Sequence, residues 1–352
     1  MAHNVELVTR ILAEARRDVL QELERIFAER RRTGYGPLYD LLADYPFREG
    51  KGLRPAICFA ACRASGGRTE QAILSATALE LFHNAFLLHD DVEDGSEFRR
   101  GKITMLRSQG APVAVNVGDA TNVLAIEPLL GNTMRIGTRK ALLVLREVER
   151  MARESAEGQA IELGWIAGGQ FDLGDRDYVR MAYKKTCWYT VIAPLRIGVI
   201  CGAPAGSLAP LEDELTQLIE LGFLAGIAFQ IHDDLLNLEA DESLYGKETS
   251  GDLWEGKRTI MLLHFLRTVT GPDRERALAI LGTPRSQKRS EDIAWLLKAM
   301  TSAGSLAYGR QLAVDYSRQA LEVDSRGLPF FQDNDDRRFL REMLNYIIDR
   351  VK

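Results

Sequence analysis

Two acidic segments, far apart in the chain, combine residue types that could bind a metal ion. The tripeptide His-Asp-Asp occurs at 89–91 and again at 232–234, and each copy ends an apolar run. Residues four apart on a helix share one face and lie about 6 Å apart along its axis. This rule places Asp90 and Asp94 on the same face, and in the second segment Asn237 takes the later position. If the two helices face each other, these side chains converge on one cavity.

A cluster of carboxylates needs a cation, because two unit charges 4 Å apart repel by roughly 4 kcal/mol at an effective dielectric constant near 20. Oxygen ligands without a nearby cysteine favour Mg²⁺, which also binds the phosphates of substrates. The alternative for one such segment is a solvated helix end, and His89 and His232 are interpreted as packing residues or hydrogen-bond donors. Two segments on apolar helices predict a magnesium site formed by Asp90, Asp91, Asp94, Asp233 and Asp234.

Magnesium held by carboxylates implies a substrate with a polyphosphate group, and such a group needs cationic side chains as well. Short basic clusters lie beside glycines, turns or apolar helices in GKGLRP, EFRRGK, YKKT, YGKE and EGKRT. Any one of these charges alone would be an ordinary surface residue. Together they predict a phosphate-binding set of Lys51, Arg54, Arg99, Arg100, Lys185, Lys247 and Lys257.

Helical periodicity dominates the elements that must position these residues. Apolar residues recur every three or four positions, and convincing alternating strands are absent, so we predict an all-α protein. Glycine and proline breakers separate the segments, but none is long enough for an interdomain linker, so residues 1–352 are predicted to form a single domain. The predicted helices cover 5–31, 71–91, 115–130, 138–166, 176–201, 211–239, 257–270, 290–322 and 335–350.

Composition excludes several classes of function. The chain has 45 basic and 50 acidic residues, a net charge of −5, which disfavours a nucleic-acid partner. The N-terminal residues lack the pattern of a signal peptide, and no uninterrupted apolar run is long enough for a transmembrane segment. The four cysteines lack CxxC spacing, so we expect reduced core residues in a cytoplasmic protein; they are Cys58, Cys62, Cys187 and Cys201.

An ordered set of motifs resembles the trans (E-type) polyprenyl diphosphate synthases, the family of farnesyl and geranylgeranyl diphosphate synthases. In chain order the motifs read GKGLRP, LFHNAFLLHDDVEDGSEFRRGK, GQAIEL, YKKT, FQIHDDLLNL and GKETSGDLWEGKRT. The resemblance implies the isoprenoid synthase fold, a single large helical bundle around a central cavity. It also implies a homodimer with the helix around 114–130 at the interface, although the apolar residues of this stretch equally fit a buried core helix. The implied reaction is head-to-tail condensation of isopentenyl diphosphate with an allylic diphosphate.

The resemblance also implies a role for each motif residue. Three Mg²⁺ ions would be held between two acidic groups, Asp90, Asp91 and Asp94 on one helix and Asp233 and Asp234 on the other. The allylic diphosphate would be surrounded by Arg99, Lys185, Lys247 and Lys257. Isopentenyl diphosphate would bind through Lys51, Arg54, His83 and Arg100, and the reacting centre would be lined by Thr186 and Gln230.

Product length is predicted from residues just before the first acidic segment. In the family, the residues four and five before it form the floor of the product pocket, and here they are Phe86 and Ala85. Ala85 permits a product longer than farnesyl, whereas Phe86 could narrow the tunnel and Phe82 could close it one turn deeper. The alternative is that both phenylalanines are only core residues. We expect a twenty-carbon geranylgeranyl product, with farnesyl second and longer chains third.

Two departures from the family pattern are expected to be tolerated. Asn237 and Glu162 each stand where aspartate is usual, but amide and carboxylate oxygens can both bind a metal or its water. Among other functions, a class I terpene cyclase shares the fold but has no isopentenyl site, which Lys51 and Arg54 supply here. A non-catalytic partner subunit would tend to lose its acidic motifs. A metal phosphohydrolase would not need basic residues around two diphosphates.

Overall fold

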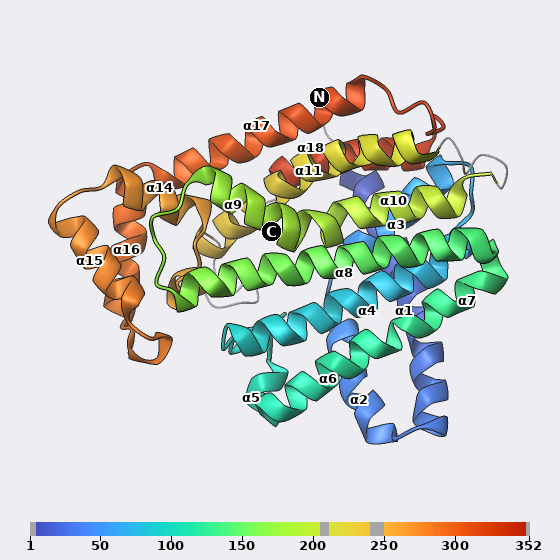
Figure 1. Ribbon diagram of the computed structural model, residues 1–352, viewed down its shortest axis with the longest axis horizontal. Helices are drawn as coiled ribbons and strands as arrows, with labels where there is room; N and C mark the ends of the chain where they lie inside the picture. The colour runs from blue at the N-terminus through green and yellow to red at the C-terminus, as the bar shows by residue number, and fades with distance from the viewer. Residues whose placement is uncertain (1–4, 205–210, 240–249, 350–352) are drawn as a thin grey trace.

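The computed structural model describes residues 5–204, 211–239 and 250–349, and nearly all of its regular structure is helical (Figure 1). The described strands, β1 (Phe98–Arg99) and β2 (Lys102–Ile103), pair antiparallel in a short hairpin directly after the first acidic segment. The prediction of an all-α protein is therefore confirmed. The single-domain organisation of residues 1–352 stays a prediction.

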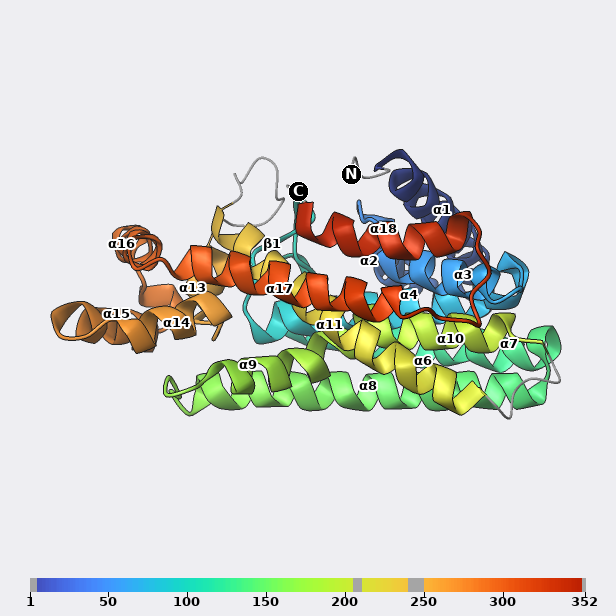
Figure 2. The ribbon, with the colours of Figure 1, turned by 90° about the horizontal axis from the view of Figure 1, so that it is seen from above.

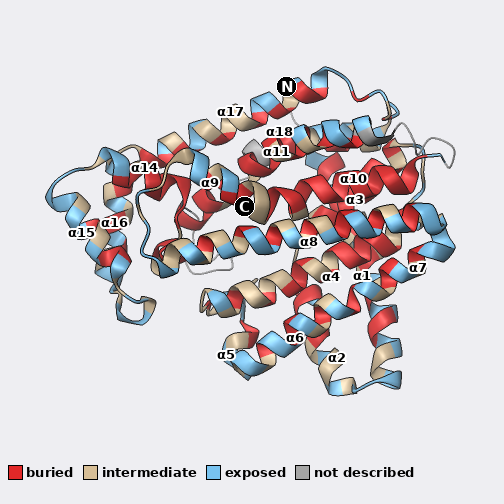
Figure 3. Cartoon of the chain, in the orientation of Figure 1, coloured by how far each residue is buried: buried red, intermediate tan, exposed pale blue. Residues whose placement is uncertain are grey.

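Six helices form the centre of the bundle and carry most of the motifs. They are α3 (Leu53–Ala64), α4 (Thr69–Glu93), α8 (Thr138–Ala167), η1 (Tyr183–Ile192), α10 (Ala193–Gly202) and α11 (Leu211–Glu239). Seen from above, α8 lies on one side of the bundle and α18 on the other, with α10 and α11 between them (Figure 2). Burial is most complete along α3 and α10, whose apolar sequences leave almost no residue exposed (Figure 3).

The other helices surround this centre. Next to α4 lie α1 (Val5–Thr33), α2 (Gly36–Phe47), α5 (Met105–Gln109), α6 (Ala111–Leu124) and α7 (Ile126–Ile136). The remaining elements are α9 (Asp175–Ala182), α13 (Gly251–Glu255), α14 (Ile260–Thr268), α15 (Pro272–Gly282), η2 (Arg285–Gln287), α16 (Ser290–Ser302), α17 (Ser305–Ser325) and α18 (Asp335–Asp349). Helices α15 and α16 project at one end of the molecule (Figure 1).

The helix predicted at 176–201 differs from the observed one in its centre. The chain runs from α9 through α10 without a break, but residues Tyr183–Ile192 form a π-helix. A π-helix is rare, and it often occurs at a functional site. This one contains the YKKT motif.

Helix α11 has the length and composition of a membrane-spanning helix over Leu215–Glu239, and 56% of its apolar 18-residue window is buried within the protein. It packs against η1 and α17 and carries the second acidic segment. We therefore interpret α11 as a core helix. The four cysteines are buried and free, which confirms their assignment as reduced core residues.

Candidate active site

The two acidic segments line one cavity of about 470 Å³ enclosed mainly by α4, α8, η1 and α11. Its wall also includes the residues that follow α13. Among the residues predicted from sequence, the cavity is lined by Phe86, Asp90, Arg99, Lys185, Thr186, Gln230, Asp233, Asp234 and Lys257. Lys247 lies outside the described residues.

Asp91 lies behind the cavity wall rather than in it. Its carboxylate is fully buried and accepts a hydrogen bond of 2.6 Å from the hydroxyl of Tyr45. The guanidinium of Arg99 donates to its other oxygen, with Nε at 2.9 Å. The same hydroxyl of Tyr45 accepts from the backbone N–H of Met105 at 3.1 Å. Asp91 therefore fixes Arg99, which also reaches Asp90 at 3.5 Å.

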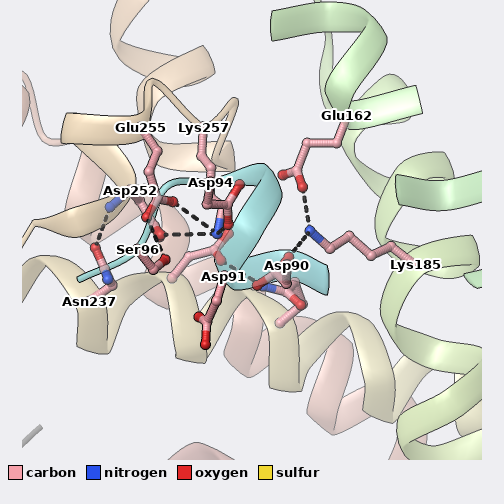
Figure 4. A network of polar contacts seen from close by, with 12 residues as sticks. Asp90, Asp91, Asp94, Ser96, Glu162, Lys185, Asn237, Asp252, Glu255 and Lys257 are labelled. Carbon is pink, nitrogen blue, oxygen red and sulfur yellow. Dashed lines mark hydrogen bonds and ion pairs between the residues drawn. The ribbon is translucent and has the colours of Figure 1, made fainter. Parts of the chain in front are cut away.

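Lys185 connects the first acidic segment to α8. Its ammonium group forms ion pairs with Glu162 and, at 3.3 Å, with Asp90 (Figure 4). Burial lowers the pKa of Lys185, but the charges of Glu162 and Asp90 outweigh burial and raise it. Helix α8 approaches η1 closely at Gly158, where an added Cβ would lie 2.2 Å from the backbone nitrogen of Lys185. The glycine of GQAIEL thus permits the contact, and its glutamate supplies the counter-charge.

Lys257 lies among three carboxylates near the end of α4. Its Nζ is 3.0 Å from Asp94, 3.1 Å from Glu255 and 3.7 Å from Asp252 (Figure 4). Burial raises the pKa of Asp94 to about 8, although the charge of Lys257 opposes this shift. The sequence analysis did not single out Asp252 and Glu255, because they lie between the predicted helices 211–239 and 257–270. In the structure they belong to the short helix α13.

The second acidic segment is organised by neutral hydrogen-bonding groups. Buried Asp234 accepts from the hydroxyl of Tyr178 at 2.7 Å and from the amide of Gln230 at 2.7 Å. The carbonyl oxygen of Gln230 accepts in turn from the hydroxyl of Thr186 at 2.5 Å. The pKa of Asp234 is raised, because burial and the charge of Asp252 outweigh the hydrogen bonds from Tyr178 and Gln230, which lower it.

Asn237 does not face the main cavity. Its side-chain oxygen accepts from the backbone N–H of Asp252 at 3.0 Å, so it fixes the start of α13. His89 packs against Gly118, where an added Cβ would lie 2.3 Å from its Nε2, and it lies 3.3 Å from Asp119.

Three of the four residues expected to bind isopentenyl diphosphate, Arg54, His83 and Arg100, lie together beside the cavity without lining it. Arg100 lies 3.3 Å from Nε2 of His83, and Arg54 donates to the hydroxyl of Thr190 at 2.9 Å. Burial lowers the pKa of Arg100; the charge of Glu80 opposes this shift, and the charges of Arg99, Arg54 and Arg16 add to it. This excess of positive charge suits an anion.

Lys51, the fourth residue expected to bind isopentenyl diphosphate, does not line the cavity, and its Nζ lies 5.9 Å from the ring centroid of Tyr346 on α18. Of the residues predicted to set product length, Phe86 lines the cavity, and the ring of Phe82 packs behind it at 6.2 Å. Ala85 is fully buried and does not line the cavity.

The donor set fits a hard divalent cation. Among the described residues, no group of three or more His, Cys, Asp or Glu side chains is arranged as a metal site. Instead, Lys185 and Lys257 pair with the first acidic segment. Oδ2 of Asp94 is buried without a hydrogen bond among the described residues, and the ammonium of Lys257 lies 3.0 Å from it. The lysines neutralise only part of the negative charge of these carboxylates. Carboxylate oxygens are the donors that Mg²⁺ prefers.

Comparisons with known proteins agree with this geometry. The profile of the family described as Polyprenyl synthetase matches residues 37–300. A short chain isoprenyl diphosphate synthase from Methanothermobacter thermautotrophicus is 31% identical over 301 residues, 86% of each chain. The crystal structure of a geranylgeranyl pyrophosphate synthetase from Pyrococcus horikoshii has a TM-score of 0.83, with 30% identity and 98% of each chain covered. A polyprenyl synthase from Caulobacter crescentus, complexed with calcium and isoprenyl diphosphate, has a TM-score of 0.84 and 26% identity, over 100% of this chain and 99% of that one.

Proposed function

The chain belongs to the polyprenyl synthetase family, and we propose that it condenses isopentenyl diphosphate head-to-tail with an allylic diphosphate to make geranylgeranyl diphosphate. The observation that carries the proposal is the meeting of two acidic segments and two lysines in one cavity. A cluster of arginines and a histidine lies next to that cavity, which supports a separate site for the second diphosphate. The family is magnesium-dependent; the number of ions, three, is part of the proposal.

The residues of the cavity favour departure of the allylic diphosphate. Bound magnesium would be held by Asp90 and Asp94 on α4 and by Asp233 and Asp234 on α11, and it would stabilise negative charge on the leaving oxygen. Asp91, the fifth predicted ligand, is occupied by Tyr45 and Arg99 and would support the site from behind. Lys185 and Lys257 carry fixed positive charges at the same wall, where a buried ammonium acts more strongly than in water.

The remaining wall keeps the allylic cation away from water. Phe86, Leu87, Leu163 and Met181 line it with apolar surface. The hydrogen-bonded chain through Gln230 fixes polar groups that would otherwise be free to rotate. Holding the two substrates in line removes the entropic cost of a bimolecular encounter, which can lower the activation free energy by about 7–11 kcal/mol. The proton lost at the end is expected to pass to the released diphosphate.

Incubation with labelled isopentenyl diphosphate and dimethylallyl, geranyl or farnesyl diphosphate tests the reaction. Label in an elongated product supports condensation. A terpene cyclase would incorporate no label, and a phosphohydrolase would release phosphate without forming a carbon–carbon bond. A partner subunit would be inactive as the purified chain alone.

The twenty-carbon product depends on Phe86, which lies on the cavity wall. Phe86→Ala removes the ring and should lengthen the product, whereas Ala85→Ser should change it less, because Ala85 is buried outside the cavity. Chromatography of the products measures both. An unchanged product from Phe86→Ala would contradict the role of Phe86.

We also propose that the chain forms a homodimer through α6 and α7. Val123, Leu130 and Met134 on these helices are 67%, 63% and 91% exposed, an unusual exposure for three neighbouring apolar side chains. Leu130→Glu should shift the molecular mass in sedimentation toward a monomer. Ala294→Glu, at an exposed residue of α16 at the opposite end of the molecule from α7 (Figure 1), is the control and should not. A wild-type monomer would contradict the proposal.

A further inference from the structure

Tyr189 of η1 lies on the border between the main cavity and the cluster of Arg54, His83 and Arg100. The tyrosine lines the cavity, whereas none of these three residues does. The guanidinium of Arg54 lies over its ring, 4.2 Å from the centroid, and the ring of His83 is 6.0 Å away. On the cavity side, Phe86 meets the same ring edge-on at 5.6 Å.

The contact between Arg54 and Tyr189 matters because the guanidinium has few other supports. Arg54 is 8% exposed, and within the described chain its Nε has no hydrogen-bond partner. The hydroxyl of Thr190, the next residue of η1, accepts from its Nη2. The ring face of Tyr189 attracts the cation, and the attraction is stronger where water is excluded. Consecutive residues of η1 thus hold Arg54 in one orientation.

We propose that Tyr189 is a positioning and specificity residue for both halves of the reaction. Its ring holds Arg54 toward the diphosphate of the isopentenyl substrate, and its edge, with Phe86, limits the space for the growing prenyl chain. This inference rests on the proposed function. It joins two properties in one side chain: the affinity for isopentenyl diphosphate and the length of the product.

Tyr189→Leu tests the inference, because leucine keeps an apolar side chain but removes the ring. The KM for isopentenyl diphosphate should rise about 2- to 30-fold, the range expected from loss of a cation–π contact. The KM for the allylic substrate should change less, and the product should lengthen by at least one five-carbon unit. Tyr189→Phe keeps the ring and should restore both properties to near the wild-type values.

Tyr183→Leu is the matched control. Tyr183 is a half-buried tyrosine of the same helix with edge contacts to Trp188 and Phe223, but it does not line the cavity. A double variant with Arg54→Lys adds a second readout. If the ring acts through Arg54, the increase in KM for the pair should be smaller than the product of the two single increases.

The outcomes separate the inference from the proposed function. If the wild type forms no elongated product, the proposed function fails. If the wild type elongates but Tyr189→Leu leaves KM and product length unchanged, or Tyr183→Leu changes them equally, the inference alone is wrong. Thermal melting identifies a variant that fails to fold, and Tyr189→Met, closer in length to the ring, then takes its place with the same expected changes.

Discussion

Tyr45→Phe should destabilise the protein by more than its single lost oxygen suggests. The hydroxyl of Tyr45 donates to the carboxylate of Asp91 at 2.6 Å and accepts from the N–H of Met105 at 3.1 Å. The side chain is 1% exposed, so water cannot replace either partner without a rearrangement. Phenylalanine keeps the ring and leaves the packing intact.

The magnitude follows from the two bonds. A hydrogen bond to a charged group contributes about 1.5–3 kcal/mol, and a buried N–H without a partner costs about 1–3 kcal/mol. The free energy of unfolding should therefore fall by about 2.5–6 kcal/mol. Because Asp91 also fixes Arg99, catalytic efficiency should fall as well.

Urea denaturation followed by circular dichroism measures the change through a shift of the midpoint at constant slope. The control is Tyr183→Phe, since the hydroxyl of Tyr183 forms no hydrogen bond with the described residues and Tyr183 lies outside the cavity. If Tyr45→Phe unfolds within about 0.5 kcal/mol of the wild type, the buried hydroxyl does not support Asp91 as described.

Three further outcomes are expected. Gly158→Ala should lower the free energy of unfolding by about 1–3 kcal/mol and reduce kcat, because the added Cβ would overlap the backbone of Lys185. Gly164→Ala, on the same helix with open space around it, should do neither. Equal effects of the two variants in urea denaturation would contradict this prediction. Burial, and then the nearby arginine charges, lower the pKa of Lys288 to about 8. Between about pH 8 and about pH 10.4 the unfolded chain therefore binds more protons at this residue than the folded protein does, so the free energy of unfolding should rise with pH. Lys288→Gln should lack this rise in denaturation curves measured between those two pH values. Mg²⁺ with inorganic diphosphate should raise the melting temperature of the wild type more than that of Asp233→Asn, and equal shifts would refute the assignment of Asp233 to the site.

Residues in repeated motifs could be predicted from the sequence, because each copy of a motif can be recognised from neighbouring residues alone. The spacing of Asp90 and Asp233 at the ends of apolar helices predicted that their segments meet, and both line one cavity. Tyr45 and Tyr178 left no such signal. Each is one tyrosine that reaches an aspartate 46 or 56 residues away, and only the packing of whole helices determines that pairing.

Helical periodicity predicted less well which side chains face the cavity. Periodicity places Ala85 and Phe86 about 100° apart on one helix, but it does not tell which of them faces the cavity. The spacing of Asn237 predicted a repeat of the first acidic segment, whereas its side chain holds the start of α13. The π-helix at Tyr183–Ile192 was also not predicted, since its residues follow an ordinary helical pattern.

The three carboxylates around Lys257 limit what that side chain can do before metal arrives. An ammonium group has three hydrogens, and Asp94, Asp252 and Glu255 already surround it. A phosphate oxygen must therefore compete with an acidic neighbour for a hydrogen of Lys257. A divalent ion bound at Asp94, as we propose, would remove one competitor, so metal and diphosphate should strengthen each other's binding by the same factor. Isothermal titration with each partner, with and without the other, would measure that reciprocity.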